Sequence, residues 1–215
     1  MQDKKKLLLG TAKVDITPDS PVFLAGFYHR KGKSVGVKSN LYSRISVFVD
    51  PENMDNKFLL IQADLIWFGN ELVEKYKKII SGKYNIPGSA IVFHASHTHS
   101  GPQTTEKFSK LLGVYESGCV EGIMNKILSG IDTAMDNIEE VNIFRGTGNC
   151  DIGINRRKVI NGTASMAPNE DGPVDNELNV ILFKTLSGNI KGLLFHYSCH
   201  PTVTDSNFIS SEYCG

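Results

Sequence analysis

The chain has 215 residues, of which 40% are hydrophobic and 21% charged, and its 23 lysine and arginine residues balance 23 aspartate and glutamate residues. This composition is typical of a globular protein, and the balanced charge argues against a nucleic-acid partner. The length allows one core of reasonable size, so we expect a single domain over residues 1–215.

The chain begins with a short basic run followed by three leucines. A signal peptide needs an apolar stretch of roughly 7–15 residues and a small-residue cleavage site, so this start is better interpreted as a first strand. No apolar run approaches the roughly 18 residues of a membrane span, so we expect no transmembrane segment. These features slightly favour the cytoplasm, whereas a protein whose leader had been removed would be secreted.

Apolar periodicity divides most of the chain into strands and helices. A strand, a helix and a second strand follow one another between residues 58 and 95, which favours a right-handed crossover, and apolar residues recur at helical spacing between 120 and 138. The fold class predicted from this order is α/β, as a mixed α/β to α+β sandwich whose mixed sheet is flanked by helices. The expected elements are strands 7–17, 45–49 and 58–63, a helix from Asn70 to about Ser81 ended by Gly82, a strand from Ile91, a helix 120–138, and strands 141–147, 179–185 and 190–196, the last two joined by the turn 186–189.

Some residues outside this pattern also suggest a function or a structural role. The glycine-rich loop 26–40, with its aromatic and basic residues, could line a binding surface or be a solvated loop. Asp64 directly follows a strand, at a sheet edge where catalytic groups often lie. The four cysteines show no C-x-x-C spacing, and we expect mostly buried free thiols.

Three histidines, His94, His97 and His99, lie within six residues at the end of the strand from Ile91. In an extended segment alternate side chains share a face, so the imidazoles of His97 and His99 could converge on one ion. Zinc prefers neutral imidazole nitrogens at about 2.0–2.1 Å, and a catalytic zinc site keeps one position open for water. The alternative is that these rings are hydrogen-bonded histidines that close a strand.

A second apolar strand also ends in histidines, at His196 and His200. Two strands that end in this way suggest one shared edge. His196 lies nearer the strand interior and suits a packing or supporting role, whereas His200 lies where the strand passes into a loop. Arg156, on another loop, offers a guanidinium group for an anionic or carbonyl oxygen, or is a solvated surface residue.

Six motifs follow one another along the chain: Gly10–Pro18, Ala25–Tyr28, Ser96–Pro102, Ile154–Arg156, Val174–Val180 and His200–Thr202. Taken in order, they resemble the landmarks of a known family, the N-terminal catalytic domain of neutral/alkaline ceramidases. The resemblance runs through nearly the whole chain, and the ordered set is more specific than any single member. It implies that this chain is the N-terminal part of such a domain and is incomplete at its C-terminal end.

The resemblance implies the following roles. His97 and His200 would ligate Zn²⁺, together with a glutamate and a tyrosine that the family supplies beyond Gly215. His99 and Arg156 would contact the reacting amide or its developing oxyanion. The implied reaction is cleavage of the amide bond of ceramide or a related N-acyl lipid by attack of a zinc-bound water, with possible peripheral contact with membrane lipid.

Two departures from the family leave the substrate open. Gln103–Thr105 stand where the family usually has Gly-Gly-Tyr, and His200 is followed by Pro-Thr-Val in place of Gly-Thr-Ser. The alternatives are a metallohydrolase of the same fold that acts on another amide or ester, and a catalytically silent folding or binding unit. Glu212 and Tyr213 correspond to a segment that does not ligate zinc in the family.

Overall fold

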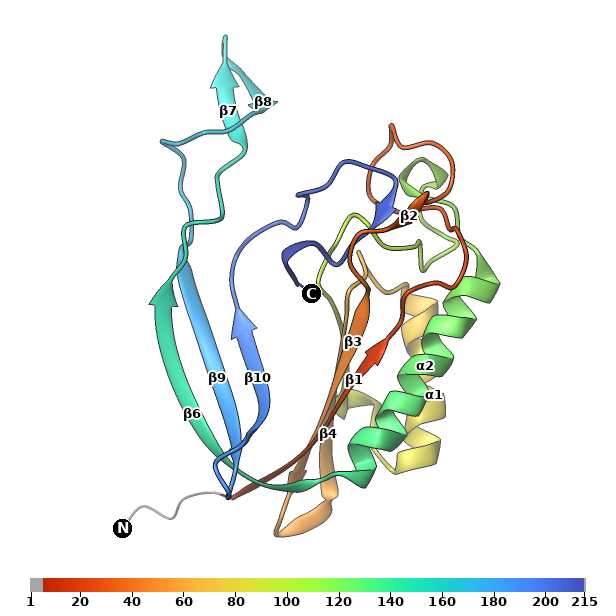
Figure 1. Ribbon diagram of the computed structural model, residues 1–215, viewed down its shortest axis with the longest axis vertical. Coiled ribbons are helices and arrows are strands. Elements are labelled where there is room, and N and C mark those ends of the chain that lie inside the picture. The colour runs from red at the N-terminus through yellow and green to blue at the C-terminus, as the bar shows by residue number, and fades with distance from the viewer. Residues whose placement is uncertain (1–5, 215) are drawn as a thin grey trace. The chain divides into compact units, whose positions relative to one another are not determined.

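A computed structural model of the protein describes residues 6–214 (Figure 1). The chain forms two compact units, which we describe separately: unit 1 takes the residues up to Glu140 and those from Pro201, and unit 2 comprises Val141–His200. The expectation of a single domain over residues 1–215 stays a prediction. The basic run at residues 1–5 lies outside the described residues.

Unit 1 is built on a mixed sheet with the strand order β1-β3-β4-β5. The pairs β1–β3 and β3–β4 are antiparallel. Strands β4 and β5, which are joined along the chain through α1, pair in parallel, as the strand–helix–strand pattern predicts. The elements of unit 1 are β1 (Leu7–Asp15), β2 (Gly36–Val37), β3 (Tyr42–Asp50), β4 (Asn53–Ala63), α1 (Asn70–Tyr84), η1 (Gly88–Ala90), β5 (Ile91–Ala95), η2 (Lys110–Leu112), α2 (Ser117–Asp136), β11 (Phe208–Ile209) and η3 (Glu212–Cys214).

The core of unit 1 lies between this sheet and the helices, which run side by side in Figure 1. Alternate residues of β3 are buried, as expected for a strand with one face on the core. Helix α2 approaches β1 very closely at Gly10, where an added Cβ would lie 1.9 Å from the carbonyl oxygen of Ala134. The absence of a side chain at Gly10 therefore sets how near the helix can pack.

Helix α1 differs from its prediction at both ends. Gly69 occupies the N-cap position and Asn70 is the first helical residue, so Asn70 does not cap the helix. The helix also continues through Gly82 to Tyr84. It ends at Asn85, which has a left-handed φ of 53° and whose N–H donates to the carbonyl oxygen of Ser81. Asparagine takes this conformation more readily than most residues, so it replaces glycine as the helix terminator.

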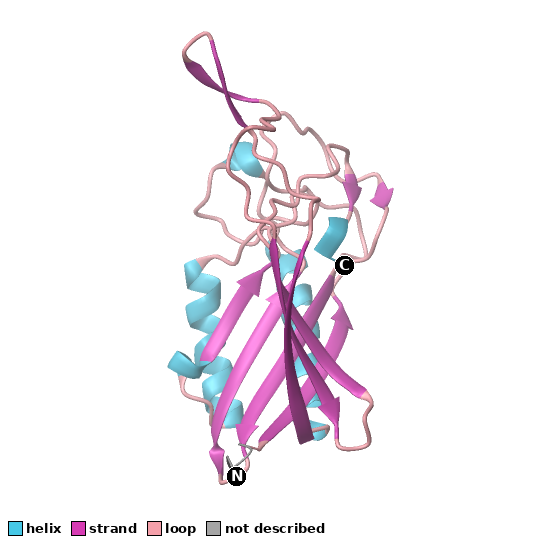
Figure 2. Cartoon of the chain, turned by 90° about the vertical axis from the view of Figure 1, so that its left-hand side faces the viewer, coloured by secondary structure: helices cyan, strands magenta, loops and turns pink. Residues whose placement is uncertain are grey.

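Unit 2 contains the antiparallel strand order β10-β9-β6 and a separate hairpin, β7–β8 (Figure 2). The turn predicted at residues 186–189 joins β9 and β10. The hairpin was not predicted, although Asn161 and Gly162 at its tip have φ values of 50° and 77°, as a two-residue Asn-Gly turn requires. The strands are β6 (Glu139–Asn149), β7 (Arg157–Ile160), β8 (Thr163–Met166), β9 (Glu177–Thr185) and β10 (Ile190–His196).

The mixed α/β class is confirmed by these elements. All four cysteines are free, as expected, but they are half-buried, so the prediction of mostly buried thiols is wrong. His196 is exposed on β10, which does not support a packing role for its ring. Among residues 6–214, no helix is both long and apolar enough to cross a membrane.

Asp64 directly follows β4 and has no exposed surface. Its carboxylate accepts hydrogen bonds from the backbone N–H of Tyr42 at 2.9 Å and from Nη1 of Arg44 at 3.0 Å. Burial raises the pKa of Asp64, and the positive charge of Arg44 partly opposes this effect. The carboxylate is therefore held within a structural ion pair, which explains its position at the sheet edge without a catalytic role.

We expect Arg44→Met to destabilise the protein by about 3 kcal/mol at pH 7, because it leaves the Asp64 charge buried and without its cation. A carboxyl whose folded-state pKa lies above its ordinary value of 3.8 loses stability as the pH rises from about 4 through the folded-state pKa. Without Arg44 this loss of stability with rising pH becomes larger. Urea unfolding at pH 4 and pH 7 measures the destabilisation caused by Arg44→Met. It should be clearly smaller at pH 4 than at pH 7, and equal destabilisation at the two pH values would contradict this explanation.

Candidate metal centre

The segment that follows β5 brings His97 and His99 together by a turn. Strand β5 ends at Ala95, and His97 has a left-handed φ of 68°. The prediction that both rings share one face of an extended strand is therefore wrong in its geometry. The rings nevertheless lie 5.1 Å apart between centroids at an interplanar angle of 80°, with one nitrogen of each within 4.8 Å of the other.

His97 has the hydrogen bonding that a metal ligand needs. Its Nδ1 lies 2.7 Å from the carbonyl oxygen of Ile66. A carbonyl can only accept, so the neutral ring carries its proton on Nδ1 and its lone pair on Nε2. This pattern is usual for zinc-bound histidines, because the carbonyl fixes the tautomer and makes the ligating nitrogen more basic. His97 therefore fits a zinc ion through Nε2.

Trp67 lies beside His97, with the ring centroids 6.2 Å apart. The indole Nε1–H donates to Oε1 of Gln103 at 2.6 Å, and the same oxygen accepts from the backbone N–H of Thr104 at 3.0 Å. Gln103 is only 2% exposed. Gln103, where the sequence departs from the family pattern, thus places a buried amide against the indole of Trp67, which lies next to His97. Trp67 was not identified from the sequence.

His99 is buried, and its surroundings come from the start of the loop 26–40. The Phe27 and His99 ring centroids lie 4.9 Å apart, and Nη1 of Arg30 donates to the carbonyl oxygen of His99 at 2.6 Å. Gly26 has a φ of 105°, and an added Cβ would lie 2.4 Å from Nδ1 of His99. We call residues 26–30 the His99 cradle. Sequence reasoning left the role of this loop open and did not identify Arg30.

The segment after residue 200 fixes the other side of the turn. The hydroxyl of Thr98 donates to the carbonyl oxygen of Ser210 at 2.8 Å, and the N–H of Ser210 donates to the carbonyl oxygen of Ser100 at 3.0 Å. The hydroxyls of Ser100 and Thr204 lie 2.9 Å apart. Glu212 uses Oε1 to accept from both the N–H and the hydroxyl of Thr204, at 3.1 Å each.

The remaining predicted site residues, Arg156 and His200, lie together in unit 2. Nη2 of Arg156 is hydrogen-bonded to Nδ1 of His200. A guanidinium group can only donate, so His200 accepts through Nδ1 and a neutral ring carries its proton on Nε2. As a zinc ligand His200 would need to offer a lone pair. Either Nδ1 is released by Arg156 and binds the metal itself, or the ring proton moves from Nε2 to Nδ1, where it could not face the Arg156 donor. His200 therefore fits a metal only after this contact opens.

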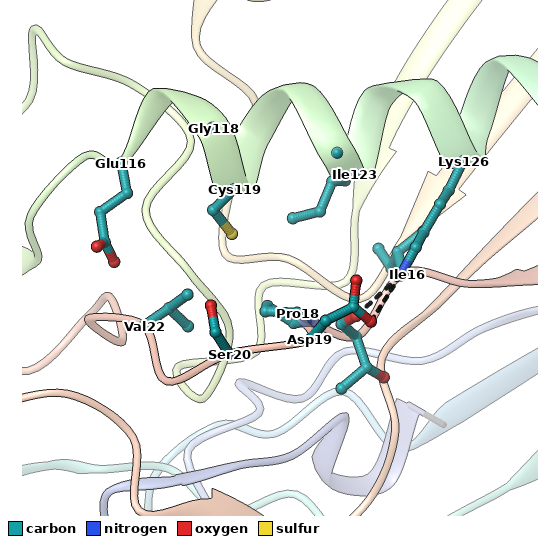
Figure 3. A pocket seen from close by; sticks show the side chains of 12 residues that line it. Ile16, Pro18, Asp19, Ser20, Val22, Glu116, Gly118, Cys119, Ile123 and Lys126 are labelled. Atoms are coloured by element: carbon teal, nitrogen blue, oxygen red, sulfur yellow. Dashed lines mark hydrogen bonds and ion pairs between the residues drawn. The ribbon is translucent and has the colours of Figure 1, made fainter.

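A pocket of about 350 Å³ lies elsewhere in unit 1, between the first half of α2 and residues 16–22 (Figure 3). Lys126 crosses one end of it and donates to the carbonyl oxygen of Thr17 at 3.1 Å. The Cys119 side chain projects toward residues 16–22, and burial raises its pKa to about 11, so the thiol stays protonated at neutral pH. The pocket is lined by none of the predicted site residues.

We expect Gly26→Ala to displace the His99 ring and to lower stability more than Gly32→Ala does. Both positions have a positive φ, 105° and 75°, which costs an alanine about 1–2 kcal/mol. Only at Gly26 would the new methyl group also collide with His99 and Ile66, at a further cost of roughly 1–3 kcal/mol. At Gly32 no atom of residues 6–214 beyond its chain neighbours would lie within 4 Å of the methyl group. Denaturant unfolding of the two variants provides the comparison, and equal losses would show that His99 does not confine this position.

Among the solved structures that resemble the chain are two of which it spans about a third of the length. The neutral ceramidase from Pseudomonas aeruginosa is 22% identical with a TM-score of 0.78, over 97% of this chain and 34% of that chain. A ceramidase complexed with C2 is 21% identical, with the same TM-score and coverage. At this identity the likeness shows the fold alone. None of the curated proteins matches the chain. The family described as neutral/alkaline non-lysosomal ceramidase, N-terminal, matches residues 7–215, and the chain therefore belongs to it.

Proposed function

We propose that this protein is a zinc-dependent amidohydrolase that cleaves the amide bond of ceramide or a related N-acyl lipid. The observation that carries the proposal is the hydrogen bond between Nδ1 of His97 and the carbonyl oxygen of Ile66, which prepares Nε2 as a metal ligand. Membership of the ceramidase family supplies the substrate class. The substrate lies in a membrane, so we also propose peripheral contact with lipid.

In this proposal His97 and His200 hold the zinc ion, as the family resemblance implies. When bound, zinc supplies a Lewis acid that activates water toward the amide carbonyl. His200 takes part after Arg156 has released its Nδ1, and that exchange also makes the guanidinium group available to a substrate oxygen. The same side chain thus passes from a resting contact with His200 to a role in binding the substrate.

His99 and Arg156 are the groups that we assign to the amide oxygen. Negative charge develops on that oxygen as the carbonyl carbon becomes tetrahedral, and one well-placed donor is worth about 3 kcal/mol in lowering the barrier. His99 is held by its backbone and by the rings around it, so it needs little reorganisation to donate. The leaving amine must also be protonated, and this requires a further acidic group near the site.

A second candidate function is hydrolysis of a different amide or an ester by the same machinery. It is favoured by the Trp67–Gln103 contact. Gln103 stands where the family usually has the first glycine of Gly-Gly-Tyr, and its buried amide oxygen accepts a hydrogen bond from the indole that lies beside His97. A fold does not determine a substrate, so these contacts are where specificity would differ. A panel of N-acylsphingosines, short amides and esters separates the two candidates.

We expect His97→Ala to reduce hydrolysis of N-acylsphingosine by more than about 100-fold, the upper range for losing a group that merely supports a metal ligand. Chelation should abolish the activity of the unchanged protein, and added zinc should restore it. The control is His94→Ala, on the exposed side of β5, which should keep wild-type turnover. Equal hydrolysis with and without His97 would refute the proposed chemistry, and a protein that neither binds zinc nor hydrolyses any substrate would be a silent binding unit.

A further inference from the structure

We propose that Arg30 is a positioning residue that holds His99 in place through both its main chain and its ring. The catalytic consequence of this role rests on the proposed function. The positioning itself rests only on contacts within unit 1 and can be tested without any activity.

The main-chain part of this hold is a charge-assisted hydrogen bond. Nη1 of Arg30 donates to the carbonyl oxygen of His99 at 2.6 Å and, more weakly, to that of Ala25 at 3.3 Å. Hydrogen bonds from a charged donor are shorter and stronger than neutral ones. One guanidinium nitrogen therefore bridges the cradle to the turn that carries His99.

The ring part of the hold is a series of contacts between three groups, in which the Phe27 and His99 rings are tilted by 58°. The guanidinium carbon of Arg30 lies 4.8 Å from the centre of the Phe27 ring, and that ring lies 4.9 Å from the His99 ring. The cation is attracted to the aromatic ring, so Arg30 restrains Phe27, which in turn contacts the imidazole. Gly26 adds a steric limit, because its backbone leaves no room for a Cβ beside the imidazole.

Arg30 is poorly suited to a purely structural role. Its Nε and Nη2 are buried, and neither has a hydrogen-bond partner within residues 6–214. Buried donors without acceptors are destabilising, so a residue kept for stability alone would be expected to satisfy them. Glu212 and Asp205 provide favourable negative charge nearby, and one oxygen of Glu212 is likewise buried and lacks a partner among the described residues. The cation is thus balanced in charge but incompletely hydrogen-bonded.

The substitution that separates positioning from stability is Arg30→Met. Methionine keeps an apolar stem of similar length and removes the two unsatisfied donors, so we expect the thermal midpoint to stay within about 3 °C of wild type. The hydrogen bond to His99 and the cation over Phe27 are both lost. Arg30→Lys keeps the charge and can reach one carbonyl oxygen, so it should recover part of the lost function. The matched control is Lys33→Met, which removes a cation of the same loop that pairs with Glu116 instead.

The direct readout is the side-chain NMR spectrum of histidine labelled with ¹⁵N, recorded without metal. In Arg30→Met we expect the His99 ring signals to shift or broaden while those of exposed His196 stay unchanged, and in Lys33→Met we expect both to match wild type. In the zinc-loaded protein we expect kcat for the amide substrate to fall about 10- to 100-fold with little change in KM, since a misplaced donor affects the transition state most.

Each outcome decides the question. A wild-type His99 signal in folded Arg30→Met would overturn the proposal, as would equal shifts in the Lys33→Met control. If Arg30→Met unfolds, the His99 ring signals of Arg30→Lys are measured instead. The positioning role requires that these signals differ from wild type while Arg30→Lys remains folded. If the wild-type protein hydrolyses no amide but the His99 signals respond as expected, the proposed function fails and the positioning role stands.

Discussion

The position of the histidine pair depends on hydrogen bonds that continue the β4–β5 pairing beyond the end of both strands. The N–H of Ser96 donates to the carbonyl oxygen of Ala63 at 3.0 Å, and the N–H of His97 donates to that of Leu65 at 2.9 Å. The ring of His97 then bonds to the next carbonyl, that of Ile66. Because β4 and β5 are parallel, their carboxyl ends meet at one edge, and the chain turns there without losing its partners.

The left-handed conformation of His97 is the cost of this arrangement. A non-glycine residue with a positive φ is uncommon, and it persists only where neighbouring contacts determine it. Here those contacts come from two sequence-distant segments of unit 1. The His99 cradle holds the ring and carbonyl of His99, while the segment around Ser210 holds Thr98 and Ser100. The rigid sheet edge supports one histidine, and the loops packed on it support the other.

Much of the fold and part of the site could be predicted from sequence. Periodicity identified the helices and longer strands because their apolar faces are buried against one core. The clustering of histidines at the end of an apolar strand singled out His97 and His99, which the fold brings together, but the rule of alternating faces was applied beyond Ala95, where the chain no longer extends. The cradle escaped prediction because an irregular loop has no period, so only three-dimensional contact shows that Arg30 reaches His99. The contact of Arg156 with His200 likewise depends on folding of unit 2, whereas the Asn161–Gly162 turn was visible in the sequence.

In the proposed site the two histidines have different roles, since His97 binds the metal and His99 does not. Competition titration with a zinc-sensitive dye, on the protein and on its His97→Ala and His99→Ala variants, measures this most directly. We expect His97→Ala to weaken zinc binding by more than about 100-fold, whereas the affinity of His99→Ala should stay within about 10-fold of that of the unchanged protein. An equal loss of zinc affinity in the two variants would contradict it, because both rings would then be ligands of one ion.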